Sequence, residues 1–74
     1  MTGEEFRIAL RRLRRGEAII YHTGLLMADR KLDRKLSALA NIAYERYQLG
    51  ECVLVQKRLE GAVPSACTYA AVRL

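Results

Sequence analysis

Apolar residues recur at helical spacing just after the N-terminus. Thr2 and Glu5 have the spacing of a capping box, which predicts that a helix begins here. The residues that follow form one apolar stripe along that helix: Phe6, Ala9, Leu10 and Leu13. Gly16 is expected to end the helix, with Arg14 and Arg15 in its last turn, where positive charge complements the helix dipole.

A second helical pattern runs from residue 31 to residue 49. Its apolar positions fall on one side of a helical wheel: Leu32, Leu36, Leu39, Ala40, Ala43 and Tyr47. The opposite side carries Arg34, Ala38, Asn41 and Glu45, with Ser37 and Gln48 at its edge. Gly50 follows and is expected to end the helix.

The segment between the two helices predicts a short strand. Residues 18–22, AIIYH, are β-branched and aromatic, and Thr23-Gly24 is expected to end the strand. Residues 25–28 predict a short helix or an apolar turn, with Asp29 available to cap the helix that follows.

The C-terminal part predicts an antiparallel hairpin, because two β-prone runs flank a loop that contains Gly61 and Pro64. A turn centred on residues 62–63 places one set of apolar residues on a packed face: Val53, Val55, Leu59, Ala66, Ala70 and Val72. The other, solvated face then holds Gln56, Arg58, Tyr69 and Arg73. In the same register Cys52 lies opposite Arg73 and Cys67 opposite Arg58. The two cysteines are thus too far apart to bridge, and both are predicted to be reduced and structural.

Together these patterns predict one small domain over residues 1–74, with a single hydrophobic core. A chain of this size buries only about 60% of the surface that its unfolded form exposes. The predicted core residues lie on the apolar faces just described: Phe6, Leu10, Leu13, Ile20, Leu36, Leu39, Ala43, Val53 and Val55.

The order of the elements is helix, short strand, short helical turn, long helix and β-hairpin, and this order resembles a winged helix-turn-helix domain. The stretches YHTGLLMADR and VLVQKRL…TYAAVR also resemble small proteins encoded in bacterial prophages. The resemblance implies an α+β fold, in which two main helices and a short helical turn pack on a three-stranded antiparallel sheet that ends in a β-hairpin.

In such a domain the helix at residues 31–49 occupies the position that reads DNA. Its N-terminal half would present Arg34, Ser37, Ala38 and Asn41 to the major groove. The basic pairs Arg30-Lys31 and Arg34-Lys35 would contact phosphates. The hairpin would be the wing, with Lys57 and Arg58 at its base and, in its tip, Glu60 but no basic residue.

Charge supports a partner that is negatively charged. The net charge is +5, and residues 1–35 hold nine Lys and Arg against five Asp and Glu, whereas residues 36–74 hold four against three. In the first helix Arg7, Arg11 and Arg15 follow one another at four-residue steps, and like charges at this spacing destabilise a helix. A sequence that tolerates them either binds a polyanion through this face or leaves the face simply solvated. Ile8 on the outer side of this helix, beside Arg11 and Arg15, is a candidate for a homodimer or partner contact.

Other classes of function have little support. No apolar run approaches the about 18 residues that span a membrane, so a cytoplasmic protein without membrane contact is expected. His22, Cys52 and Cys67 lack the spacing of metal ligands, and glycine-rich phosphate loops are absent. We therefore expect no catalytic residue, metal or cofactor, and no enzyme.

Two functions remain. The first is a small DNA-binding winged-helix protein, a regulator of phage origin, whose partner is duplex DNA. The second is an interaction module of the same fold, whose basic first helix docks an acidic protein. Arginines of both helices on one face would favour DNA, and arginines on opposite faces would favour the acidic partner.

Overall fold

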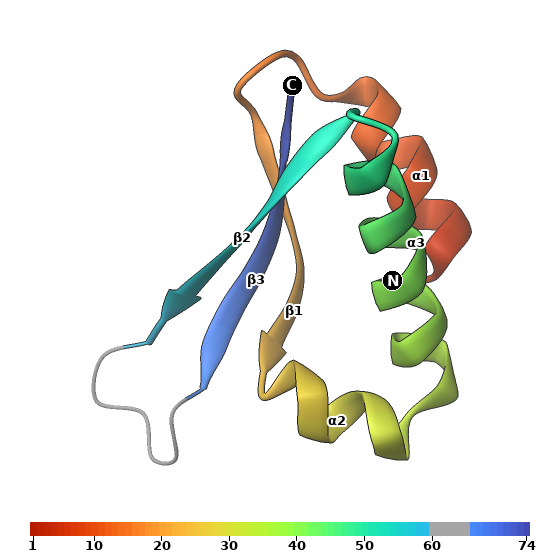
Figure 1. The fold of residues 1–74 in the computed structure, drawn as a ribbon, viewed down its shortest axis with the longest axis vertical. Coiled ribbons are helices and arrows are strands. Elements are labelled where there is room, and N and C mark those ends of the chain that lie inside the picture. Colours follow the sequence, from red (N-terminus) through yellow and green to blue (C-terminus); the bar gives the residue numbers. More distant parts are fainter. Residues whose placement is uncertain (60–65) are drawn as a thin grey trace.

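Two helices lie side by side on one face of a three-stranded sheet, and a shorter helix lies at one end of the same layer (Figure 1). This computed structural model describes residues 1–59 and 66–74. Within them the elements are α1 (Gly3–Arg12), β1 (Ala18–Gly24), α2 (Leu26–Leu32), α3 (Arg34–Gln48), β2 (Cys52–Arg58) and β3 (Cys67–Arg73). The sheet is antiparallel with the order β1-β3-β2. The predicted α+β class is confirmed, and a winged-helix-like description is compatible with it.

The capping box predicted for α1 is present. The Glu5 backbone N–H donates to Thr2 Oγ1 at 3.1 Å, and the Thr2 N–H donates to Glu5 Oε1 at 2.9 Å. The Glu5 carboxylate accepts from the Thr2 backbone and side chain, which favours its ionised form and lowers the pKa of Glu5. The predicted end of the helix was wrong, since α1 stops at Arg12 and leaves Arg14 and Arg15 outside. The backbone turns away to reach the sheet, where the Gly16 N–H donates to the Arg73 carbonyl oxygen at 2.8 Å.

The predicted helix at residues 31–49 begins later than expected. Asp33 is extended, and its carboxylate accepts from the Lys35 and Leu36 N–H groups at 2.9 and 3.2 Å, so it caps α3 and separates it from α2. Leu32 consequently ends α2 and is 91% exposed, instead of lying on the apolar stripe. Tyr47, predicted on the same stripe, is also exposed.

The predicted hairpin register is confirmed, but the predicted packed face is wrong. Cys52 pairs with Arg73 and Arg58 with Cys67. The helices cover the opposite face from the one expected, because Cys52 and Ala71 lie in the core, with Leu54 and Tyr69 packed against it. Both faces of this hairpin are rich in apolar residues, so period-two alternation did not identify which one the helices cover. The predicted turn centre at residues 62–63 lies outside the described residues.

β1 faces the helices with the side chains that the sequence placed outside. Ile19 pairs with Ala71 of the core and Ile20 with Ala70, so regular alternation points Tyr21 into the core and leaves Ile20 59% exposed. The register shifts between Ile20 and His22, so that His22 lies opposite Tyr69. Ile20 and Val55 were therefore wrongly predicted as core residues, whereas Leu13 and Val53 are half-buried. The core comprises Phe6, Leu10, Tyr21, Leu36, Leu39, Ala43, Cys52 and Ala71, which confirms the other five predicted residues.

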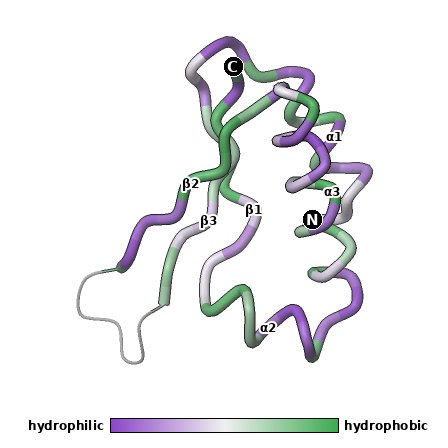
Figure 2. Tube along the Cα trace, in the orientation of Figure 1, coloured by the Kyte–Doolittle hydropathy of each residue, from purple (hydrophilic) through white to green (hydrophobic). Residues whose placement is uncertain are grey.

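The core joins α1 and α3 to the half of the sheet farther from the hairpin loop. Figure 2 shows hydrophobic positions along that half of β1, β2 and β3 and hydrophilic ones at the end of β2. Phe6 and Tyr21 meet edge to face, with ring centroids 5.6 Å apart. Cys52 and Cys67 are buried and are not bridged to each other. Among the described residues, no helix has the length and apolarity that crossing a membrane requires.

Candidate nucleic-acid interface

Six basic residues gather at one end of the molecule, where α2 meets α3 and where β2 ends (Figure 1). They are Arg30, Lys31, Arg34, Lys35, Lys57 and Arg58. All are exposed except Arg30, which is half-buried. In the described part of the chain, none of them forms an ion pair with a carboxylate. All six basic residues therefore lie toward the same end of the long axis, with the end of β2 across the width of the molecule from the α2–α3 junction.

Two other basic residues are held by carboxylates or by a backbone carbonyl, which are partners that the structure gives to none of these six. Arg46 contacts both Glu45 and Glu51 at 2.8 Å, and these contacts raise its pKa. Arg73 Nη1 donates to the Leu10 carbonyl oxygen at 2.7 Å and ties β3 to the end of α1. The pairing with Arg46 also offsets the charge of Glu45 on the outer side of α3.

In the described residues, the two acids nearest the α2–α3 junction, Asp29 and Asp33, bind backbone N–H groups. Asp33 caps α3, as described above. Asp29, expected to cap that helix, instead lies within α2 and accepts from the Leu25 N–H at 3.1 Å and from His22 Nε2 at 2.8 Å. Both carboxylates therefore already accept hydrogen bonds that stabilise α2 and α3.

The first turn of α3 has an unusual distribution of charge. It contains no acid, and it contains Arg34 and Lys35. The helix dipole favours negative side chains at this end and disfavours positive ones, by about 0.3–1 kcal/mol each. Asp33 already complements the dipole from the cap position, so helix stability does not account for these two cations, whereas an anion beside the cap would interact with both of them.

The outer face of α3 carries the residues predicted to read bases. Arg34, Ala38 and Asn41 are exposed and follow at helical spacing, and Ser37 beside them is half-buried. Arg30 reaches this face from α2: its Nη2 lies 2.6 Å from Asn41 Oδ1 and 3.4 Å from Ser37 Oγ. Arg30 was expected to contact a phosphate beside the helix. It instead lies across the predicted reading face.

This contact restricts what Asn41 can recognise. A bidentate contact with adenine uses both the oxygen and the nitrogen of the asparagine amide. Because Arg30 occupies the oxygen, that contact requires Arg30 to move away, and a guanidinium released near DNA has phosphates within reach. Sequence reasoning missed this coupling, since the two residues lie 11 positions apart on different helices.

Two side chains from the sheet position α2, and sequence reasoning did not identify either role. His22, at the end of β1, bonds Asp29 in α2 as noted, and the Leu26 N–H donates to the Tyr69 hydroxyl oxygen at 3.2 Å. The sequence suggested only a polar strand end for His22 and a solvated position for Tyr69. The Tyr69 ring instead lies against the core and faces His22, with ring centroids 5.9 Å apart.

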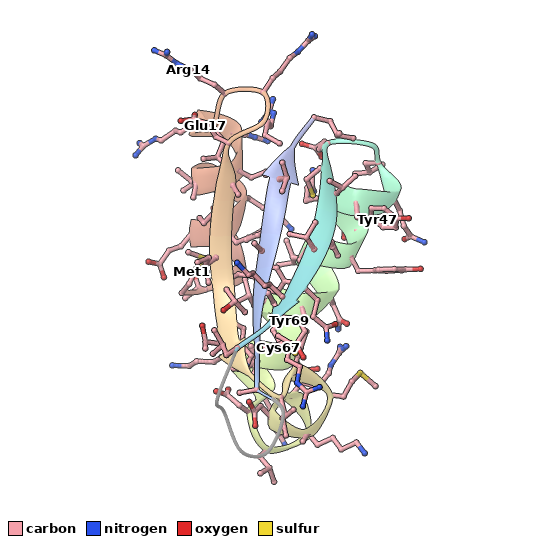
Figure 3. The ribbon with its side chains drawn as sticks, turned by 90° about the vertical axis from the view of Figure 1, so that its left-hand side faces the viewer. Met1, Arg14, Glu17, Tyr47, Cys67 and Tyr69 are labelled. Atoms are coloured by element: carbon pink, nitrogen blue, oxygen red, sulfur yellow. The ribbon has the colours of Figure 1, made fainter. Side chains whose placement is uncertain are left out.

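The second predicted basic group lies elsewhere. Arg7, Arg11 and Arg15 are exposed, but the end of α1 and the turn that follows it lie at the opposite end of the long axis from the α2–α3 junction (Figure 1). Figure 3 shows Arg14 and Glu17 at this far end, with Arg14 pointing away from the molecule. The two basic groups thus lie at opposite ends of the molecule, whereas α1 and α3 share one face of the sheet, so this arrangement is neither of the two that were expected to decide between DNA and an acidic partner.

Features of other functional classes are few. Within residues 1–59 and 66–74, no three His, Cys, Asp or Glu side chains are grouped to hold a metal ion. Burial raises the pKa of the Cys52 thiol, which disfavours a reactive thiolate there. The tip of the predicted wing, including Glu60, lies outside the described residues.

Comparison with protein-family models, with curated proteins and with solved structures gave no match for this chain.

Proposed function

We propose that the protein binds duplex DNA through the end of the molecule where α2 meets α3. In this proposal the beginning of α3 enters the major groove, and the end of β2 lies beside it against the backbone. The observation that carries the proposal is the group of six basic residues there, from three elements, without a carboxylate partner among the described residues. The resemblance of the element order to a winged helix-turn-helix supports the same orientation.

Binding would begin with the phosphates. Lys31, Lys35, Lys57 and Arg58 are exposed and can each replace a condensed counterion on the duplex, and the release of counterions supplies most of the sequence-independent affinity. Base reading would come from Arg34 and Asn41, with Ala38 between them small enough to permit close approach. Arg30 would leave Asn41 and join the phosphate contacts.

Two double charge reversals test which end binds. We expect Arg34→Glu/Lys35→Glu to abolish binding to a mixed-sequence duplex at 50 mM salt. The matched control is Arg11→Glu/Arg15→Glu, which changes the net charge equally at the other end and should weaken binding only slightly. Equal losses in the two variants would contradict the proposed interface, since they would show a response to net charge alone.

A second function is supported by the basic group that lies at the far end from the α2–α3 junction. The end of α1 and the following turn carry Arg11, Arg12, Arg14 and Arg15, and only Glu17 lies among them, with its Oε1 accepting from the Arg14 backbone N–H at 2.6 Å. An acidic protein segment would fit this surface. Its test uses the same two variants with poly-glutamate as the probe: loss of binding in Arg11→Glu/Arg15→Glu alone supports it, and loss only in the other variant contradicts it.

A further inference from the structure

The sheet has a face that no helix or strand among residues 1–59 and 66–74 covers (Figure 3). Three rows of side chains run across it, each with one residue from every strand. They are Ala18, Val72 and Val53, then Ile20, Ala70 and Val55, then Thr23, Thr68 and Lys57. We call these nine residues the open face. Two of its rows are wholly apolar, and Ile20 and Val55 are 59% and 44% exposed.

We infer that the open face is a homodimer interface, in which two copies of the protein pack sheet against sheet. Its two apolar rows adjoin each other and are rimmed by the polar row of Thr23, Thr68 and Lys57, and an apolar patch with a polar rim is typical of a site of association. Val53, Val55, Ala70 and Val72 of the open face also belong to the packed face that was predicted from the alternating pattern. In the dimer that face is packed, against the second copy and not against the helices.

The size of the open face suits a weak dimer. Each strand has seven residues. Strands about 4.8 Å apart that rise about 3.3 Å per residue give a face of roughly 14 by 23 Å. Two such faces have about 650 Å² of flat area, and the relief of their side chains raises the buried surface toward about 1,000 Å², which is the size of a weak or transient interface. We therefore expect a weak dimer, with a dissociation constant of micromolar order or above.

The shape of the open face allows it to fit a copy of itself. Ala70 faces outward at the centre but is only 8% exposed, because Ile20 and Val55 rise on either side of it. A two-fold related copy can place its own Ile20 or Val55 over the groove at Ala70. This arrangement resembles the interdigitation of side chains between the sheets of a β-sandwich, which pack about 10 Å apart.

Charge also favours a second copy over a charged partner. Each chain has a net charge of +5, so two copies repel unless they meet through neutral surface. Lys57 is the one charged residue of the open face, and it lies at the edge nearest the hairpin loop. The other basic residues of both groups lie outside the open face, so Lys57 is the one residue that the two proposed interfaces share.

The dimer would also set the distance between the two reading helices, a consequence that rests on the proposed function. With a two-fold axis parallel to the strands, both basic ends point in one direction. Three layer spacings of about 10 Å, α3 to sheet, sheet to sheet and sheet to α3, put the two α3 helices about 30 Å apart. Successive major grooves on one side of DNA are about 34 Å apart, so the dimer would contact two half-sites one turn apart.

Sedimentation velocity without DNA tests the dimer by itself. From about 1 to 500 µM, a range that covers dissociation constants of micromolar order, the mass should rise from 8.4 kDa toward twice that value. Ile20→Glu should remain monomeric throughout. Ile8→Glu, an equal charge change at another exposed isoleucine, should dimerise as the wild type does. Urea unfolding should show that both variants are folded, and Val55→Thr, which keeps a β-branched side chain, should weaken the dimer at least several-fold.

Three results would overturn the inference: a wild-type monomer at the highest concentration, a dimer that persists in Ile20→Glu, or a dimer lost in Ile8→Glu. The last result would move the interface to α1. Because these measurements contain no DNA, failure of the DNA proposal leaves their outcome unchanged. The wild type should then bind a duplex of about 25 base pairs with two copies per duplex. Binding of single copies by a dimerising protein would contradict the half-site spacing alone.

Discussion

At the scale of single residues, Leu39 and Leu32 belong to the same apolar stripe in the sequence but have different environments. Leu39 is 2% exposed and lies in the core with residues of α1 and the sheet, whereas Leu32 is 91% exposed. We expect Leu39→Ala to lower the free energy of unfolding by about 2–5 kcal/mol, because it empties a buried site. Leu32→Ala should change it by less than about 0.5 kcal/mol. Urea denaturation measures both, and equal effects would contradict the position of Asp33 between the two helices.

Two buried acidic groups predict loss of stability at alkaline pH. Burial raises the pKa of Tyr21 and of Cys52, so the folded protein holds both neutral at a pH where the unfolded chain ionises them. The unfolded state then binds fewer protons, and the free energy of unfolding falls as pH rises above about 8.5. Denaturation at pH 7 and 9.5 under reducing conditions should show this fall, and it should be smaller in Tyr21→Phe. An increase in stability over the same interval would contradict the burial of both groups.

At the scale of elements, Asp33 separates α2 from α3. Its carboxylate accepts two N–H groups of the first turn of α3, so Asp33→Ala should cost about 1 kcal/mol in free energy of unfolding. Asp33→Asn should be nearly neutral, because asparagine caps helices as well as aspartate does. Thermal or urea unfolding compares the two. If both variants lose the same stability, the charge of Asp33 matters and its role as a cap is contradicted.

The sequence predicted the elements and the hairpin register, because helical periodicity, caps and the Gly/Pro loop are local signals. It did not predict which side of the hairpin faces the helices, since Val53 and Val55 alternate with Cys52 and Leu54 and both sets are apolar. The helix boundary at Asp33 was also missed, because the apolar spacing continues across it from Leu32.

The basic residues of the candidate site could be predicted from the sequence, but the contacts that these and neighbouring side chains make could not. Clusters of lysine and arginine are visible in any sequence, and the fold brings those of α2, α3 and β2 to one end. The contact between Arg30 and Asn41 and the bond between His22 and Asp29 arise from how α2 lies against its neighbours. Only tertiary structure sets that geometry.

At the scale of the whole molecule, substitutions within the proposed DNA interface should affect either the overall affinity for DNA or the preference for one base pair. Lys35→Ala removes a phosphate contact, so it should weaken binding to all duplexes alike and reduce the log–log salt slope by about one unit. Asn41→Ala should instead relax the preference at one base pair, by about 1–3 kcal/mol. Titrations against a panel of single-base variants of a selected site separate the two effects. A uniform loss in Asn41→Ala would show that this residue does not read bases.

The salt dependence of DNA binding tests the central claim most directly. Three to five phosphate contacts predict a log–log slope of about −3 to −4.5, so affinity for a mixed-sequence duplex should fall about 60- to 500-fold between 50 and 200 mM salt. The affinity of the wild-type protein for fluorescent duplex, measured by anisotropy at both salt concentrations, gives this ratio. Absence of binding at 50 mM salt, where even non-specific contact with DNA is strong, would contradict the DNA-binding function and leave the acidic partner of α1 as the proposed function.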